Sequence, residues 1–530
     1  MRPEPRQRTG RSAALVAVGI LCSRLVGLVR QRVIAHYFGL TTDVADAWAA
    51  GFRIPNLVQN LFGEGALSAS FIPVYASLVA RGDRRQADRV AGAVGSLLAL
   101  VVSGVVLVGV VATPWLIDVI APGFTGDRRA LTIAVVRILF PGMGLLVLSA
   151  WCLGILNSHH RFLLSYTAPV TWSAAMIAAL AWFGETTPLP RLVEILAWGS
   201  VVGSALQLGV QLPMVLKVAP DLRAAIDTSS EEVRTIVRNF FPAFFSRGVV
   251  QVSAYIDTLL ASLLPVGAVA GLTNATTLYT LPVSLFGVSV SAAELPVMSS
   301  TSGTDATGFE TLRGRLDAGL RRIAFFVIPS AMAFLALGDV VAAALLQTGR
   351  FRHADAIYVW AILAGSSIGL LASTLARLYA STCYALRDTR TPLRYAIVRV
   401  SLTTVLGYLC AIPVPRLLGI PPAWGASGLT ASAGVAGWVE MLLLRRALNT
   451  RIGQTGLPPA YVVKLWTAAA CGAIAAWAVK LLIPPLHPVI AAIVVLGPYG
   501  VVFFACAFAL RVPEVHGVLA RLRRSAWLAR

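Results

Sequence analysis

The chain has 530 residues, of which 57% are hydrophobic and only 13% are charged, and its mean hydropathy is +0.76. A soluble chain of this length needs far more polar surface, so the composition excludes a soluble globular protein and predicts one that spans a membrane. The net charge of +20 would suggest nucleic acid in a soluble protein. Here it indicates membrane topology, and no nucleic-acid partner is expected.

Mostly apolar segments of about 20 residues or more follow one another along the whole chain, and there are fourteen of them. Their ranges are 12–36, 44–76, 91–120, 131–156, 163–184, 191–216, 239–264, 269–301, 318–346, 355–384, 393–412, 424–444, 460–482 and 488–511. Membrane β-strands are about half as long and alternate apolar with polar residues. The predicted fold class is therefore an all-α polytopic membrane protein with fourteen transmembrane helices.

The cations are divided unevenly between the two sides of these segments. The N-terminus, every second loop and the C-terminus together carry 28 Lys and Arg residues, whereas the loops on the other side, the first one excepted, carry seven. Because Lys and Arg accumulate in cytoplasmic loops, both termini are predicted to be cytoplasmic.

A few arginines in the first two segments break this pattern. Arg24, Arg30, Arg32 and Arg53 lie inside these segments or at their outer ends, where a charge that faces lipid costs at least a few kcal/mol. Several like charges retained at that cost favour a wet cavity that binds an anionic ligand. The alternative is that they form buried ion pairs with neighbouring side chains.

The second segment has one polar face. Asp46, Arg53 and Asn60 are spaced i, i+7, i+14, and Glu64 lies close to the same stripe. Asp46 and Arg53 are about 10 Å apart along a helix axis, so they cannot pair with each other. Pro55, which lies between Arg53 and Asn60, is expected to interrupt the helix within this stripe.

Composition also limits the chemistry. The six cysteines have no paired spacing, and no lysine follows a G-x-x-x-x-G run, so disulfides, a zinc site and bound ATP are not expected. No cofactor is predicted. The sequence leaves open whether transport is coupled to membrane potential or to a cation.

Several short runs together resemble one family. They are SRLVGLVR at 23–30, FRIPN at 52–56, LFGEGALS at 61–68, APGF at 121–124, QTGRF at 347–351 and DTRTP at 388–392. Each run alone is weak, but the combination, spread over most of the chain, resembles the MurJ (MviN) lipid II flippases of the multidrug/oligosaccharidyl-lipid/polysaccharide exporter superfamily.

The resemblance implies two pseudo-symmetric six-helix lobes around a central cavity, here 1–220 and 221–450, followed by two more helices and a basic cytoplasmic tail in 451–530. It implies a secondary-type transporter, not an enzyme, in the bacterial cytoplasmic (inner) membrane. The cargo would be undecaprenyl-pyrophosphate-linked disaccharide-pentapeptide, moved to the outer leaflet by alternating access. Other implied partners are membrane lipids and, as a further class, cell-wall synthesis proteins.

The resemblance also implies roles for particular residues. Arg24, Arg30 and Arg53 match the cavity arginines that bind the anionic head group. Asp46 and Glu64 match polar positions used for gating between the lobes.

Two positions depart from the family pattern. Gln59 and Thr277 stand where members often carry cavity arginines. Arg247 is our candidate for replacing one of these cations.

A cation site is only weakly indicated. Asp257 and Thr430 match two ligands of a sodium site that some members carry, but Thr403 and Gly407 stand where those members have Asn and Asp. Whether the chain binds a metal therefore stays unknown. Two other functions stay open. One is a divergent superfamily transporter of another polyprenyl-linked saccharide, and the other is an integral membrane polyprenyl-sugar glycosyltransferase.

Overall fold

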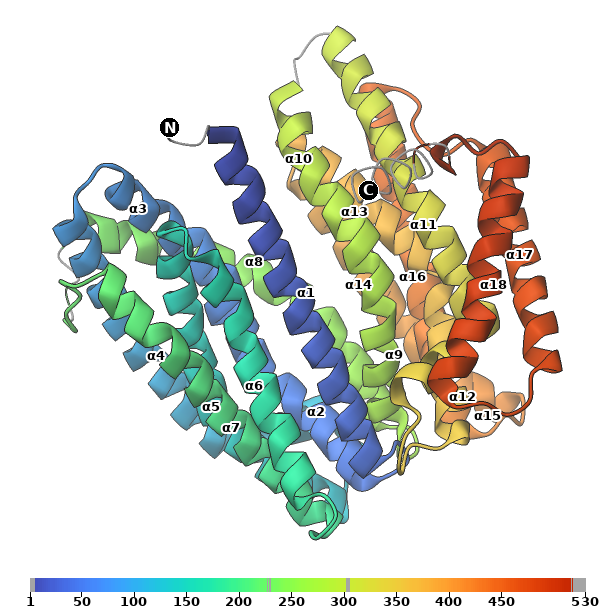
Figure 1. Cartoon of the computed structure of the whole chain (residues 1–530), viewed down its shortest axis with the longest axis horizontal. Coiled ribbons are helices and arrows are strands. Elements are labelled where there is room, and N and C mark those ends of the chain that lie inside the picture. Colours follow the sequence, from blue (N-terminus) through green and yellow to red (C-terminus); the bar gives the residue numbers. More distant parts are fainter. Residues whose placement is uncertain (1–4, 226, 228–229, 302–305, 516, 518–530) are drawn as a thin grey trace, which may run out of the picture. The chain divides into compact units, whose positions relative to one another are not determined.

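The computed structural model describes residues 5–225, 227, 230–301, 306–515 and 517 (Figure 1). Within these ranges, the side chains of residues 5–18, 20, 21, 64, 65, 243, 245–254, 292, 296, 299–301, 306 and 307 are not described. The described residues form helices joined by short connections, with no strand among them. The chain divides into two compact units, 1–270 with 348–351 and 271–347 with 352–530.

The first unit holds eight α-helices and one π-helical segment, and it includes the start of α9. Its elements are α1 (Pro5–Phe38), α2 (Asp43–Val58), η1 (Gln59–Leu67), α3 (Ser68–Ala80), α4 (Arg84–Ile120), α5 (Gly126–Ser158), α6 (Phe162–Phe183), α7 (Leu189–Val218) and α8 (Glu231–Ser262).

The second unit holds most of α9 and the remaining helices. Its elements are α9 (Ala268–Pro282), η2 (Val283–Val288), α10 (Ser289–Thr301), α11 (Ala306–Leu346), α12 (His353–Ser367), α13 (Leu370–Ala385), α14 (Arg390–Ala411), α15 (Pro413–Leu417), η3 (Pro422–Trp424), α16 (Gly425–Ile452), α17 (Pro459–Leu482) and α18 (Pro488–Ala509).

Each of the fourteen predicted segments falls on one of these helices or on a run of consecutive ones. Among the described residues, eleven helices are long and apolar enough to cross a membrane, and α12 with α13, bent by 44°, makes a twelfth. The two other predicted segments coincide with α1 and α8. The all-helical membrane fold is therefore confirmed, and the number of spans is compatible with fourteen.

The expected interruption at Pro55 is wrong. Proline lies inside α2, and the helix continues to Val58. The change of geometry comes at Gln59, where a π-helical segment begins that ends at Leu67. A wider turn changes the angular spacing of residues after Gln59, so the i, i+7, i+14 stripe does not continue regularly beyond it.

Close helix packing in both units depends on paired glycines. In α7, Gly199 and Gly203 face α6, where an added Cβ would lie 2.8 Å from Ala179 Cβ or 2.7 Å from the Trp172 carbonyl oxygen. In the second unit, Gly369 approaches Gly434 of α16 so closely that its Cβ would lie 2.4 Å from the Gly434 Cα. Glycines spaced four apart let helix backbones approach where lipid gives no hydrophobic drive.

Within the second unit, α17 and α18 are attached to α11 by polar side chains. α11 has a non-helical residue at Leu337, and the indole of Trp477 donates to the neighbouring Ala336 carbonyl at 2.9 Å. Lys480 of α17 lies 2.5 Å from Asp339, and the Tyr499 hydroxyl of α18 donates to the Pro329 carbonyl at 2.6 Å. Two aromatic side chains thus donate to backbone carbonyls of α11, and Lys480 pairs with its Asp339 carboxylate.

The DTRTP run has a local structural role, because Asp388 organises the start of α14. Its carboxylate accepts hydrogen bonds from the Thr391 hydroxyl at 2.6 Å and from the backbone N–H groups of Thr391 and Arg390. Arg451 lies 2.7 Å away. The hydrogen bonds from Thr391, with help from the Arg451 charge, lower the pKa of Asp388 to about 2. This turn lies outside the membrane-spanning helices.

We expect Thr391→Val to destabilise the protein at pH 7 by about 1 kcal/mol, because the Asp388 carboxylate loses a hydrogen bond at a partly hydrated site. The folded pKa lies below the unfolded value of about 3.9, so this stabilisation exists at neutral pH and is lost as pH falls through about 2. Unfolding in detergent at pH 7 and pH 2 measures the difference. Thr389→Val, whose hydroxyl caps nothing, is the control. An equal loss at both pH values would contradict the expectation.

Candidate functional site

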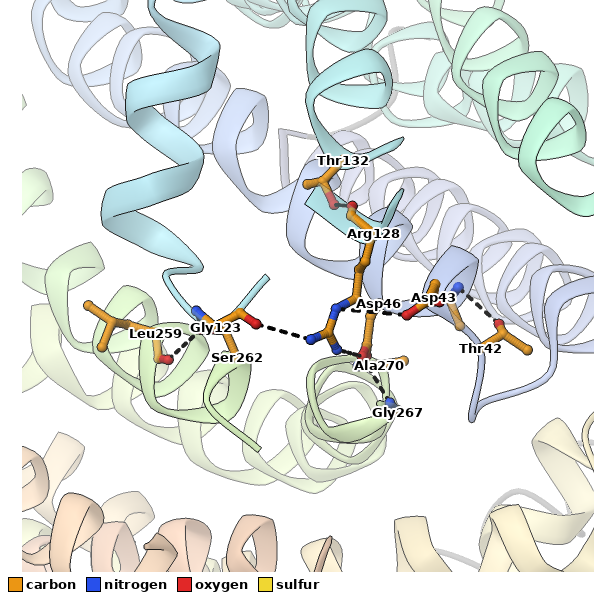
Figure 2. Close-up of polar contacts among 11 residues, drawn as sticks. Thr42, Asp43, Asp46, Gly123, Arg128, Thr132, Leu259, Ser262, Gly267 and Ala270 are labelled. Atoms are coloured by element: carbon orange, nitrogen blue, oxygen red, sulfur yellow. Dashed lines mark hydrogen bonds and ion pairs between the residues drawn. The ribbon is translucent and has the colours of Figure 1, made fainter. Parts of the chain in front are cut away.

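The carboxylate of Asp46 in α2 caps the first turn of α9. Its two oxygens accept hydrogen bonds from the backbone N–H groups of Gly267 and Ala270, both at 2.9 Å (Figure 2). Gly267 has a φ of +94°, a conformation that favours glycine and turns its N–H toward the carboxylate. Asp46 is only 1% exposed. Asp46, although distant in sequence, thus acts as an N-cap of α9 and places negative charge at the positive end of that helix.

Arg128, in the first turn of α5, neutralises this buried carboxylate. Its Nη1 lies 3.3 Å from Asp46 Oδ2, and its Nη2 donates to the Gly123 carbonyl at 3.1 Å (Figure 2). The guanidinium also covers the ring of Phe124 at 4.4 Å from the ring centroid. Asp43 lies at 3.8 Å but its side chain is 55% exposed. Asp46 is therefore the partner that matters for Arg128.

A third contact joins the same group of elements. The N–H of Gly123, in the turn after α4, donates to the Ser262 hydroxyl at the end of α8 at 3.3 Å. A Cβ on Gly123 would lie 2.0 Å from the Ser262 carbonyl oxygen, so only glycine fits here. We call Asp46, Gly123, Arg128, Ser262, Gly267 and Ala270 the Asp46 network. It connects α2, the α4–α5 turn and the α8–α9 turn at one end of the first unit.

Arg53 lies on α2 about 10 Å along the helix axis from Asp46 and contacts α8. Its guanidinium donates to the Thr258 hydroxyl, and its charge interacts with that of Asp257. The Tyr255 hydroxyl donates to the Arg53 carbonyl at 2.7 Å. Asp46 and Arg53 thus have separate partners, as their axial spacing requires. An arginine in such surroundings is held in one position by several polar groups.

Arg30 lies on α1 and contacts α6. Its guanidinium lies over the Trp172 ring at 4.6 Å from the centroid, and Nη1 donates to the Ser173 hydroxyl at 3.4 Å. The Trp172 ring also stacks on Phe52, the neighbour of Arg53, with centroids 5.8 Å apart. The buried Nε of Arg30 has no hydrogen-bond partner in the structure.

Arg24 is exposed on α1, six residues before Arg30. No ion pair links it to another of the described residues. The two arginines lie on different sides of the helix, as a spacing of six residues gives about 120° between them. The structure thus places Arg30 against Trp172, which stacks on Phe52, and Arg53 against α8, and it leaves Arg24 apart from both.

The other predicted polar positions are distributed over both units. Gln59 is half-buried at the start of η1. Thr277, in α9 of the second unit, donates its hydroxyl to the Thr273 carbonyl one turn earlier. The side chains of Glu64 and Arg247 lie outside the described part of the structure. The roles of all four residues stay predictions.

The two weak metal candidates have protein partners. Asp257 interacts with Arg53, and the buried Thr430 hydroxyl donates to the Ile362 carbonyl at 2.8 Å. Within the described residues, no three His, Cys, Asp or Glu side chains cluster closely enough to hold a metal ion. Ligation by Asp257 or Thr430 therefore has no geometric support beyond the sequence pattern.

Sequence reasoning missed several residues of this site. Arg128 is one of the seven Lys and Arg residues in the less basic loops, a position that predicts nothing about binding, and no sequence pattern singles out Thr258, Tyr255 or Trp172. Arg128 follows the APGF run by four residues, which is the single local sign of its importance. Their roles come from contacts between residues 82 to 205 positions apart in the chain, which no local pattern encodes.

Comparison with known proteins decides the family. The family model described as "Lipid II flippase MurJ" matches residues 34–504. The chain belongs to the MurJ family. The lipid II flippase MurJ of Burkholderia cenocepacia is 32% identical over 81% of this chain and 82% of its own length. The probable lipid II flippase MurJ of Rhizobium meliloti is 30% identical over 83% of this chain and 80% of its own length.

Solved structures agree at the level of the fold. A lipid II flippase MurJ in an inward closed conformation superimposes with a TM-score of 0.75 at 20% identity, covering 94% of this chain and 99% of that one. A multidrug transporter of the MATE family in an inward-facing conformation superimposes with a TM-score of 0.65 at 17% identity, covering 83% of this chain and 98% of that one. The MurJ family is a family of transporters rather than enzymes, and this member is a polytopic membrane protein.

Proposed function

We propose that this chain is a lipid II flippase that moves undecaprenyl-pyrophosphate-linked disaccharide-pentapeptide from the cytoplasmic to the outer leaflet of the bacterial inner membrane. The observation that carries the proposal is the family match over residues 34–504. The partly buried positions of Arg30 and Arg53 supply a chemical reason for an anionic cargo.

Arg30 and Arg53 are the proposed pyrophosphate ligands, with Arg24 as an exposed third cation. A pyrophosphate carries about two negative charges, and a guanidinium can meet each phosphate through two parallel hydrogen bonds. Such pairing offsets the cost of moving the head group through a region of low dielectric. The polyprenyl tail stays in lipid throughout, so the protein has to shield only the head group.

The Asp46 network is the proposed gate at one end of the transport path. It joins α2, the α4–α5 turn and the α8–α9 turn through one ion pair and three backbone N–H groups. Each of these groups has its hydrogen-bond or ion-pair partner in the described arrangement, so this arrangement is a stable state. Opening of the gate has to break these contacts together. Glu64 and Arg247 remain sequence-based candidates for further gating or cavity contacts.

Alternating access by a secondary-type mechanism completes the proposal. Residues 1–220 and 221–450 are the proposed lobes, and 451–530 adds two helices and the basic tail. Both termini are proposed to be cytoplasmic, since 28 cations lie on that side. This orientation puts the Asp46 network on the outer side. Coupling to membrane potential would draw on about 2.3 kcal/mol per charge per 100 mV.

Complementation tests the proposal. The chain is expressed in a bacterium depleted of its own lipid II flippase, and colony formation is scored. We expect growth to be restored by the wild type and lost in an Arg30→Ala, Arg53→Ala double variant present at equal membrane level. Absence of rescue by the wild type would favour the alternative cargo, another polyprenyl-linked saccharide, which Gln59 and Thr277 keep open.

A further inference from the structure

An apolar groove runs along the outside of the first unit between α4 and α5. It has a volume of about 350 Å³ and is lined by Ala99, Val102, Ser103, Val106, Leu107 and Val110 of α4 together with Pro141, Gly144, Leu145 and Leu148 of α5. Exposed apolar side chains such as Leu107 and Val108, at 67% and 65%, flank it. In a membrane protein such a surface faces lipid. The groove is separate from the Asp46 network and from Arg30 and Arg53.

The length of the groove corresponds to one leaflet. From Ala99 to Val110 the α4 axis advances by about 16 Å, and half of the hydrocarbon core is about 15 Å thick. Trp115, 67% exposed and five residues beyond Val110, about 8 Å along the axis, is of the type that lies at the membrane interface. The Val110 end of the groove is therefore the end nearer the head groups on the side where residues 121–125 lie, and the Ala99 end lies deeper in the hydrocarbon core.

A guanidinium marks the Val110 end. Arg137 of α5 is exposed and its Nε donates to the Val110 carbonyl at 3.3 Å. This carbonyl has no helical donor, because its partner would be the missing N–H of Pro114. The hydrogen bond holds Arg137 at the mouth of the groove. No carboxylate among the described residues pairs with Arg137, and its side chain is exposed.

A cation at the edge of the hydrocarbon is costly without an anion, and an apolar groove of leaflet length is suited to an acyl chain. We propose that this groove binds an anionic diacyl phospholipid of that leaflet, with one acyl chain between α4 and α5 and the phosphate on Arg137. The occupant is a lipid rather than a protein helix, because a helix about 10 Å wide does not fit between two helices already in contact. The bound lipid reinforces the α4–α5 pair beside Pro114 and Pro141.

Native mass spectrometry of the full chain, purified in mild detergent and mixed with equal phosphatidylglycerol and phosphatidylcholine, tests this. We expect about fivefold preference for phosphatidylglycerol. Arg137→Gln should abolish the preference, although glutamine can still donate to the Val110 carbonyl. Arg191→Gln removes an exposed arginine at the start of α7, away from the groove, and should keep it.

A second pair of variants tests whether an acyl chain occupies the groove. Ser103→Phe fills the groove from an exposed position and should reduce retention of both lipids, whereas Val108→Phe, exposed beside the groove, should not. Equal retention of the two lipids by the wild type, or an unchanged preference in Arg137→Gln, would overturn the proposal. Recovery of a dimer without phospholipid would overturn it in favour of a second copy as the occupant.

Discussion

Arg53→Ala is expected to abolish transport. The guanidinium contacts Thr258 and the charge of Asp257, and in the proposed function it binds the pyrophosphate. Removing one member of a buried, hydrogen-bonded charge pair costs about 2 to 5 kcal/mol, which lowers cargo affinity about 30-fold or more. The measurement is growth of a flippase-depleted strain carrying the variant, with its membrane level checked by immunoblot. Arg53→Lys keeps the charge but loses the planar fork, so we expect partial activity.

A double variant separates cargo binding from a structural ion pair. If Arg53 only neutralises Asp257, then Arg53→Gln with Asp257→Asn removes both charges and restores growth. If Arg53 binds the cargo, the double variant stays inactive even when Asp257→Asn alone grows. Growth of the double variant at the wild-type rate would therefore refute the cargo role of Arg53.

Asp46→Ala is expected to destabilise the described arrangement of α2, α5 and the α8–α9 turn, and this is the second large effect. The substitution removes the acceptor for two backbone N–H groups and leaves Arg128, whose side chain is only 12% exposed, without its buried partner. Leaving such a charge unpaired costs about 3 to 5 kcal/mol. The described arrangement of α2, α5 and the α8–α9 turn should lose population by more than about 100-fold relative to open arrangements.

Thiol labelling measures this opening. Ser262→Cys, placed in a chain without its native cysteines, is buried in the Asp46 network and should react slowly with a membrane-impermeant reagent. Asp46→Ala should speed its labelling. Asp43→Ala is the matched control, because Asp43 also lies near Arg128 but its side chain is 55% exposed, and it should change stability by less than about 0.5 kcal/mol. Identical labelling in the two variants would argue against a gate.

Much of the fold could be predicted because it follows from hydropathy alone. Every predicted apolar segment coincides with a helix or a run of helices, since a chain in lipid must satisfy its backbone hydrogen bonds internally. Local geometry was less predictable. Pro55 leaves α2 intact, and the π-helical turn begins at Gln59, where the sequence has no marker that distinguishes it from an α-helix.

The candidate site could be predicted in part. The predictable part consists of the charged residues that lie inside apolar segments. Arg30 and Arg53 stand out because an arginine inside an apolar segment needs a reason. Their partners do not stand out, because Trp172 and Thr258 are ordinary residues of apolar helices. Arg128 was obscured by its place in a loop, where a cation usually marks topology. Asp257 matches a ligand of a sodium site in the sequence pattern, whereas in the structure its charge interacts with that of Arg53.

Leaflet-resolved measurement of the lipid-linked precursor tests the proposed transport itself. In flippase-depleted cells carrying either the wild type or Arg53→Ala, a membrane-impermeant hydrolase added outside cleaves only the precursor that has reached the outer leaflet. We expect the wild type to restore the cleavable fraction, and Arg53→Ala to leave the precursor uncleaved while its total amount rises. Equal cleavage in the two strains, or none in the wild-type strain, would contradict a flippase that holds its cargo through Arg53.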